Sequence, residues 1–187
     1  EWLAEREAVL IHPPRRVLSV YLDNDRLGMF HDSMEGVLPR KKLRFRRYAP
    51  RDQPTTGWCL ESKISSVEGR FKTSLPSDVD PYFFKGGLSD NHYGLCRPRV
   101  EVTYLRSYFA FAGVRVTVDR DIGYRSFSLS LRSMLSVTDP DVAVELKAPQ
   151  ALPADLLERL FPWDRTRFSK YCRAIEAVLF HGHPRSA

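Results

Sequence analysis

The chain has 187 residues, of which 43% are hydrophobic and 28% are charged, as in a soluble globular domain large enough for a real core. Its 29 Lys and Arg residues exceed its 23 Asp and Glu residues, and the net charge of +6 favours an anionic partner such as nucleic acid, nucleotide or polyphosphate. No apolar run approaches the ~18 residues that span a bilayer, which excludes a transmembrane segment in this chain.

In chain order, the first half of the sequence predicts strands joined by turns and polar loops. Residues 1–11 are expected to end a short helix, because Pro13-Pro14 cannot continue it. Ser77 is placed to cap a short helix over residues 77–85. Between these helices, strands are expected at residues 16–23, 41–48, 58–64 and 69–75.

The second half predicts a hairpin followed by helices. A loop is expected over residues 90–98, and so few residues separate segments 99–111 and 113–119 that they should pair as antiparallel strands. Residues 124–135 have no clear pattern, and residues 141–147 have the alternation of a strand. Apolar residues recur at helical spacing in segments 154–160 and 167–179.

Five of the expected strands place charged residues on one face and apolar residues on the other, by the two-residue period of a strand. The charged faces hold Lys42, Arg44, Arg46 and Tyr48; Glu61 and Lys63; Tyr104 and Arg106; Arg115, Thr117 and Asp119; and Glu145 and Lys147. One or two such strands would be solvated sheet faces. Five of them, rich in Arg and Lys, suggest a shared polar interior that holds a polyanion.

About eight strands in mostly antiparallel hairpins predict an α+β fold, a closed β-barrel or tunnel with a charged interior and helices packed outside. Segment 167–179 is amphipathic and is expected to cover the outer face. Crowded Arg and Lys side chains repel each other unless an anion lies among them, and guanidinium groups match phosphate oxygens. Glu145 in that setting suits a ligand of Mg²⁺ or Mn²⁺, which predicts metal-assisted phosphoryl transfer.

Six motifs follow one another along the chain. They are Arg44-Phe45-Arg46-Arg47-Tyr48, Leu60-Glu61-Ser62-Lys63, Tyr104-Leu105-Arg106, Val114-Arg115-Val116-Thr117-Val118-Asp119, Val144-Glu145-Leu146-Lys147 and Phe168-Ser169-Lys170-Tyr171. Their order resembles that of VTC domains, the polyphosphate polymerase domains of the triphosphate tunnel metalloenzyme (CYTH-like) superfamily. The resemblance covers about residues 17–172 and implies a single VTC-like domain over residues 1–187. Because the Glu- and Lys-bearing strand with which that family begins has no clear counterpart, we expect this chain to lack it.

The resemblance also implies an activity and a site. VTC domains transfer the terminal phosphate of ATP to a growing inorganic polyphosphate chain, with Mn²⁺ or Mg²⁺. The positions that match the family's phosphate-binding residues are Arg44, Arg46, Lys63, Tyr104, Arg106, Arg115, Ser169 and Lys170. We expect their cations, Arg44, Arg46, Lys63, Arg106, Arg115 and Lys170, to act in catalysis. Glu145 matches the family's metal-binding Glu.

Three hypotheses follow for the function. The first is a polyphosphate polymerase. The second is a tripolyphosphatase or nucleoside triphosphatase, in which water attacks at the same site. The third is a non-catalytic module that binds polyphosphate, inositol phosphates or RNA. Glu145, which we expect to be buried, argues against pure anion binding, because such binding gains nothing from a buried carboxylate. ATP and inorganic polyphosphate are the expected partners, and no nucleic acid is expected, because Tyr and Phe lie mainly in apolar strand patterns.

Purely structural roles for several of these residues also remain open. Glu61 and Glu145 are also compatible with ion pairing to nearby Lys and Arg, and Ser169-Lys170 with an ordinary helix start. Asp119 is compatible either with balancing Arg charge or with binding a metal. Cys59, Cys96 and Cys172 are widely spaced, with no paired-Cys motif, which predicts free thiols and no zinc site. Because no signal peptide opens the sequence, we expect the protein to be cytoplasmic. Any membrane attachment would come through a partner or a segment outside this chain.

Overall fold

The computed structural model describes residues 1–50, 57–127, 136–149, 153–161 and 163–181. Its strands are β1 (Val9–Asp23), β2 (Arg40–Pro50), β3 (Trp58–Ser66), β4 (Gly69–Ser77), β5 (Leu88–Asp90), β6 (Gly94–Phe111), β7 (Val114–Ser126), β8 (Ser136–Thr138) and β9 (Ala143–Lys147). Its helices are α1 (Trp2–Glu5), α2 (Gly28–Glu35), α3 (Ala154–Leu160) and α4 (Lys170–Ile175), which continues as the π-helix η1 (Glu176–His181). None of the helices in these described ranges is long and apolar enough to cross a membrane.

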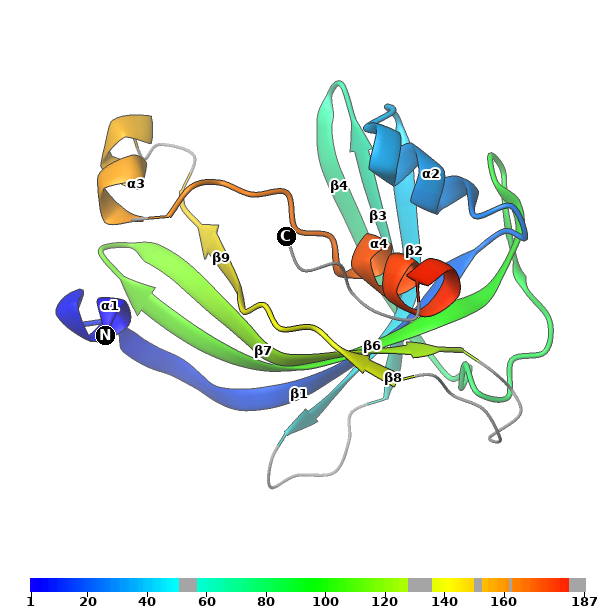
Figure 1. Cartoon of the computed structure of the whole chain (residues 1–187), viewed down its shortest axis with the longest axis horizontal. Helices are drawn as coiled ribbons and strands as arrows, with labels where there is room; N and C mark the ends of the chain where they lie inside the picture. The colour runs from blue at the N-terminus through cyan, green and yellow to red at the C-terminus, as the bar shows by residue number, and fades with distance from the viewer. Residues whose placement is uncertain (51–56, 128–135, 150–152, 162, 182–187) are drawn as a thin grey trace.

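The described strands form one strongly curved antiparallel sheet in the order β4-β3-β2-β1-β6-β7-β8, with β5 on β6 and β9 on β7 (Figure 1). The expected α+β class and mostly antiparallel sheet are therefore confirmed. The closed barrel is not confirmed, because β4 and β9 lie apart and no described strand joins them. Strand β7 also divides its edge between β8 and β9, so neither of these short strands continues the sheet along its full length.

Several element predictions are confirmed, and three are wrong. The hairpin of β6 and β7, the strand β4 and the helix α3 form where the sequence predicts them. The first strand does not begin after Pro13-Pro14 but runs through them, and the pairing of β1 with β6 is irregular at His12, where the missing proline N–H groups are tolerated. Ser77 ends β4 and residues 78–85 form a loop with one turn rather than a helix, and the predicted loop over 90–98 is largely strand.

Helix α2 was not predicted, because its capping group lies outside the helix. The Asp23 carboxylate at the end of β1 accepts hydrogen bonds from the backbone N–H groups of Met29 and Phe30, at 3.0 Å each. The sequence places no Ser, Thr, Asp or Asn at the N-cap itself, which is Leu27 in a left-handed conformation. The helix start is therefore set by a contact over six residues, which local propensity does not reveal.

Helix α4 lies on the concave face of the sheet, so the prediction of helices only on the outside is wrong (Figure 1). The Tyr171 ring stacks on Tyr21 of β1 with ring centroids 5.0 Å apart, and its hydroxyl donates to Asp23. Tyr21 lies opposite Val100 of β6. One end of this face is thus apolar, and α4 removes it from water. We call this concave face the inner face.

The outer face is covered by the segment between β4 and β5 rather than by a helix. Phe84 packs against Phe45 of β2 with ring centroids 5.9 Å apart, and Tyr82 lies 6.3 Å from Trp58 of β3. These contacts bury the apolar residues that alternate with the charged positions of β2 and β3. The sheet consequently packs on both sides at this end, which holds the charged strands in place.

Candidate functional site

The register of the sheet gathers the predicted charged residues on the inner face. Residues that lie directly opposite each other on paired strands point to the same face of a sheet. The opposed pairs are Lys42 and Lys63, Arg44 and Glu61, Tyr21 and Arg44, Arg106 and Asp119, Thr117 and Glu145, and Arg115 and Lys147. The five two-faced strands therefore share one polar face, although the sheet is open.

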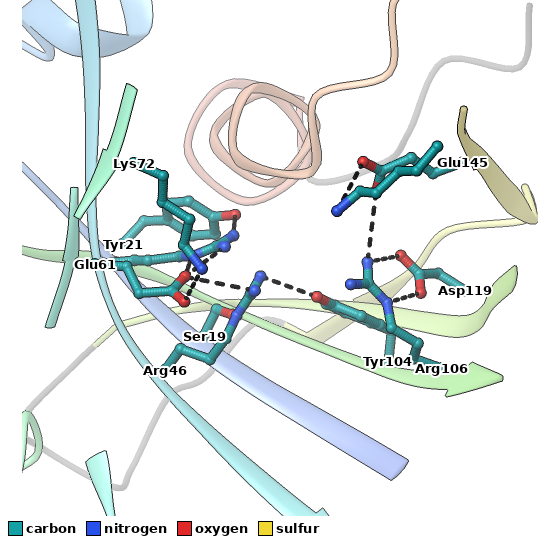
Figure 2. A network of polar contacts seen from close by, with 11 residues as sticks. Ser19, Tyr21, Arg46, Glu61, Lys72, Tyr104, Arg106, Asp119 and Glu145 are labelled. Carbon is teal, nitrogen blue, oxygen red and sulfur yellow. Dashed lines mark hydrogen bonds and ion pairs between the residues drawn. The ribbon is translucent and has the colours of Figure 1, made fainter. Parts of the chain in front are cut away.

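Glu61 of β3 is the centre of a first cluster of cations (Figure 2). Arg44 Nε donates to Glu61 Oε2 at 2.7 Å, Arg46 Nη1 lies 3.4 Å from the same oxygen, and Lys72 Nζ lies 2.6 Å from Oε1. Burial alone would raise the pKa of Glu61, but Arg44 and Arg46 outweigh it and hold that pKa at about 2. Glu61 is thus an ion-pair partner that fixes the positions of three cations.

Arg46 connects this cluster to the rest of the inner face. Its Nε donates to Ser19 Oγ at 3.2 Å and its Nη2 donates to the Tyr104 hydroxyl at 3.0 Å. Burial raises the pKa of Tyr104 to about 12, although Arg46 and Arg106 act in the opposite direction. The Tyr104 hydroxyl therefore stays protonated and accepts the hydrogen bond from Arg46 at neutral pH.

Asp119 of β7 is the centre of a second cluster, on the other side of Tyr104 (Figure 2). Arg106 binds both carboxylate oxygens, with Nε 2.6 Å from Oδ1 and Nη2 2.7 Å from Oδ2, and Lys170 Nζ lies 2.7 Å from Oδ2. Burial would raise the pKa of Asp119, but Arg106 and Lys170 lower it. Asp119 therefore balances cation charge, which is one of the two roles left open for it.

Glu145 of β9 is held much more loosely than Glu61 or Asp119. Its Oε2 lies 4.0 Å from Arg106 Nη2 and its Oε1 lies 3.7 Å from Lys147 Nζ. Its side chain is 50% exposed, so the expectation of a buried Glu145 is wrong. Glu145 consequently has carboxylate oxygens that are open to a further ligand beside the second cluster.

The start of helix α4 joins the two sides of the inner face. Ser169 is the N-cap residue, and its hydroxyl accepts both the Cys172 N–H at 3.3 Å and the Lys42 ammonium at 2.8 Å. The next residue, Lys170, reaches Asp119 and lies 4.9 Å from the centre of the Tyr104 ring. The helix start thus contributes one hydroxyl and one cation to the same face as the strands.

Lys63 and Arg115 lie on the inner face without fixed partners. Neither has a hydrogen bond or an ion pair within the part of the chain that the structure describes. Desolvation lowers the pKa of Lys63, and the positive charge of Arg44 acts in the same direction. Of the predicted site residues, Arg44, Arg46, Tyr104, Arg106 and Lys170 belong to one contact network, whereas Lys63 and Arg115 lie beside it.

A comparison with protein families decides which family this arrangement represents. The family model described as the VTC domain matches residues 3–83 and 88–179, which is nearly the whole chain. The chain belongs to the VTC domain family. This membership connects it with polyphosphate metabolism. A search of the curated proteins found no match to the chain.

Three residues of this VTC domain reach the site although the sequence analysis did not include them among the phosphate-binding residues. Lys42 contacts Ser169, Lys72 contacts Glu61, and the Tyr21 hydroxyl accepts a hydrogen bond from Arg44 Nη1 at 2.8 Å. Lys42 and Arg44 are two residues apart in one strand, so the sequence pattern already predicted that Lys42 lies on the same face as Arg44. The places of Lys72 and Tyr21 depend on strand pairing, which the pattern of a single strand does not contain.

The donor set tests whether this VTC domain fits the expected metal. Among the described residues, no group of three or more His, Cys, Asp and Glu side chains could hold a metal ion. Glu61 and Asp119 are engaged with cations, which leaves Glu145 as an available carboxylate. Mg²⁺ in phosphoryl-transfer sites commonly takes one or two carboxylates together with substrate phosphates and water. The described residues therefore fit a metal that binds with the phosphates, and those residues do not fit a metal held by protein ligands alone.

Proposed function

We propose that this VTC domain is a polyphosphate polymerase that transfers the γ-phosphate of ATP to the end of an inorganic polyphosphate chain. The observation that supports it best is the line of cations on one face, from Arg44 and Arg46 to Arg106 and Lys170, with half-exposed Glu145 beside it. A polyphosphate chain carries negative charge on every unit. A row of cations matches such a chain better than a single compact cation cluster does.

The cations are held in position before any substrate arrives. Glu61 and Asp119 anchor Arg44, Arg46, Arg106 and Lys170 through contacts of 2.6–3.4 Å. Donors that are fixed in advance need little reorganisation when charge develops in a transition state. In phosphoryl transfer, positioning and charge neutralisation supply most of the catalysis. These four side chains are therefore suited to orient the phosphates of donor and acceptor.

The proposed reaction needs no covalent contribution from the protein. A terminal oxygen of the polyphosphate chain attacks the γ-phosphorus of ATP, the bond from that phosphorus to the β–γ bridging oxygen breaks, and ADP leaves with the electron pair. Arg44, Arg46, Arg106 and Lys170 balance the charge on the phosphate oxygens during this exchange. Mn²⁺ or Mg²⁺ held by Glu145 and phosphate oxygens would supply further charge neutralisation.

The test is an assay of the purified protein with ATP and Mn²⁺, with the products separated on a gel. A polymerase yields a ladder of polyphosphate, whereas free phosphate without polymer would assign the site to hydrolysis of ATP or tripolyphosphate. Absence of turnover together with tight polyphosphate binding would assign it to binding alone. Either of the last two results rejects the polymerase.

Glu145→Gln tests the role of the carboxylate in the same assay. We expect turnover to be lost and polyphosphate affinity to be largely kept, because the substitution removes a metal ligand but no cation. Glu68→Gln is the matched control, since Glu68 is an exposed carboxylate in the turn between β3 and β4. If Glu145→Gln keeps the activity of the control, Glu145 does not hold the metal.

A further inference from the structure

A second group of polar atoms lies on the inner face beside Arg106 and beyond it. Arg15 Nε, the Tyr108 hydroxyl and the Thr117 hydroxyl are buried, and none has a hydrogen-bond partner among the described residues. Arg15 lies opposite Arg106 on β6, and Tyr108 lies opposite Thr117 on β7, so the three side chains belong to adjacent strands. Buried polar atoms in native proteins nearly always have a partner, and a cluster of exceptions calls for a bound group.

Arg15 is held between two aromatic rings rather than by a carboxylate. Its guanidinium carbon lies 4.8 Å from the centroid of the Tyr48 ring and 4.8 Å from that of the Tyr108 ring. Its terminal nitrogens have no hydrogen bond or ion pair in the described part of the chain, and they are not among the buried unpaired atoms, so they face solvent. Arg44, Arg46 and Arg106 each have a carboxylate partner, whereas Arg15 has stacking contacts and no carboxylate partner among the described residues.

The three unpaired groups share the ability to donate hydrogen bonds. A guanidinium donates only, and tyrosine and threonine hydroxyls donate readily to an oxyanion. Thr117 is only 4% exposed, so its hydroxyl has little access to bulk water. Glu145 lies opposite Thr117, but its oxygens are placed beside Arg106 and Lys147. The group that satisfies all three donors is an anion rather than a cation.

We propose that Arg15, Tyr108 and Thr117 form an additional phosphate subsite, which binds a unit of a polyphosphate chain that extends past Arg106. This inference rests on the proposed function and adds a preference for chain length. Tyr21, which contacts Arg44, and Arg15 are six residues apart on β1, or about 20 Å at ~3.3 Å per residue. A ligand that contacts both Arg44 and Arg15 is therefore much longer than a triphosphate.

Binding measurements with inorganic tripolyphosphate and with long inorganic polyphosphate test the subsite without ATP or turnover. Arg15→Gln and Thr117→Val should each weaken long-chain binding roughly tenfold, the typical effect of losing a hydrogen bond to a charged group. Tripolyphosphate affinity should stay at the wild-type value. Because the Thr117 hydroxyl is unpaired without ligand, Thr117→Val should also keep or raise the thermal unfolding temperature of the free protein.

Arg16→Gln is the matched control, because it removes the same charge from an exposed neighbour on the opposite face of β1. Its affinity for both ligands should equal that of the wild type. If the wild type binds long polyphosphate and both inner-face variants bind it equally well, the subsite is wrong and the proposed function stands. Equal losses for tripolyphosphate and long polyphosphate would also overturn it. A wild type that binds no polyphosphate at all would reject the proposed function, and the subsite with it.

Discussion

Asp119→Asn is the substitution that should test the inner face most directly. The side chain of Asp119 is 2% exposed and contacts Arg106 and Lys170, whose side chains are 13% and 15% exposed. The substitution keeps the size of the side chain and removes its charge, which leaves two desolvated cations without a counterion. Removing one member of a buried ion pair costs about 3–5 kcal/mol. For a domain of this length, that loss corresponds to a fall of roughly 6–20 °C in Tm.

The effect should depend on pH in a defined direction. Burial would raise the pKa of Asp119, but Arg106 and Lys170 lower it below its value in the unfolded chain. The ion pairs therefore stabilise the protein fully above about pH 4, near the pKa of an unperturbed Asp, and their contribution is lost as the pH falls through the depressed folded-state pKa. Thermal unfolding followed by circular dichroism at neutral pH and at stepwise lower pH should show the wild type losing its advantage over the variant.

Asp121→Asn supplies the control for this series. Asp121 is exposed on the same strand, and its left-handed backbone, with φ of 54°, is one that asparagine adopts readily, so the Tm should not change. Added polyphosphate should raise the Tm of Asp119→Asn more than that of the wild type, because phosphate oxygens can replace the lost carboxylate. A wild-type Tm for Asp119→Asn at neutral pH would refute the ion-pair reasoning.

Two further substitutions give separate tests. Desolvation and Arg44 lower the pKa of Lys63, so polyphosphate affinity should fall as alkaline pH deprotonates this lysine. Lys63→Arg should keep its affinity at the same alkaline pH, because arginine stays charged. If polyphosphate affinity depends on pH in the same way for both proteins, Lys63 does not contact phosphate. Tyr171→Phe removes the hydroxyl that donates to buried Asp23, so urea unfolding should show a loss of about 1–3 kcal/mol. An unchanged urea midpoint would mean that Tyr171 does not anchor α4 through this bond.

The composition of the inner face was predictable from single strands. Alternation at Arg44 and Arg46 in β2, and at Arg106 in β6, survives folding, because successive side chains of a strand always point to opposite faces. The roles of the acidic residues were not predictable in the same way. Glu61 and Asp119 became ion-pair centres only because strand register places them opposite Arg44 and Arg106.

The position of α4 shows a second limit of sequence patterns. Its amphipathic spacing indicates that one side is buried, but it does not say which face of the sheet receives that side. The inner face is apolar around Tyr21 and Val100, where the Tyr171 ring stacks on Tyr21 and the Tyr171 hydroxyl donates a hydrogen bond to Asp23. Contacts between residues so distant in sequence depend on the assembled sheet.

The amino-acid sequence by itself determined that this VTC domain has two-faced strands, a mostly antiparallel sheet and a set of Arg and Lys side chains on the charged strand faces. Those features follow from local periodicity and residue chemistry. Tertiary structure alone decided that the described sheet stays open, that α4 lies on the inner face, and that Arg15 lies between two tyrosine rings. Register and packing join residues that are far apart along the chain, and no local pattern specifies which of them meet.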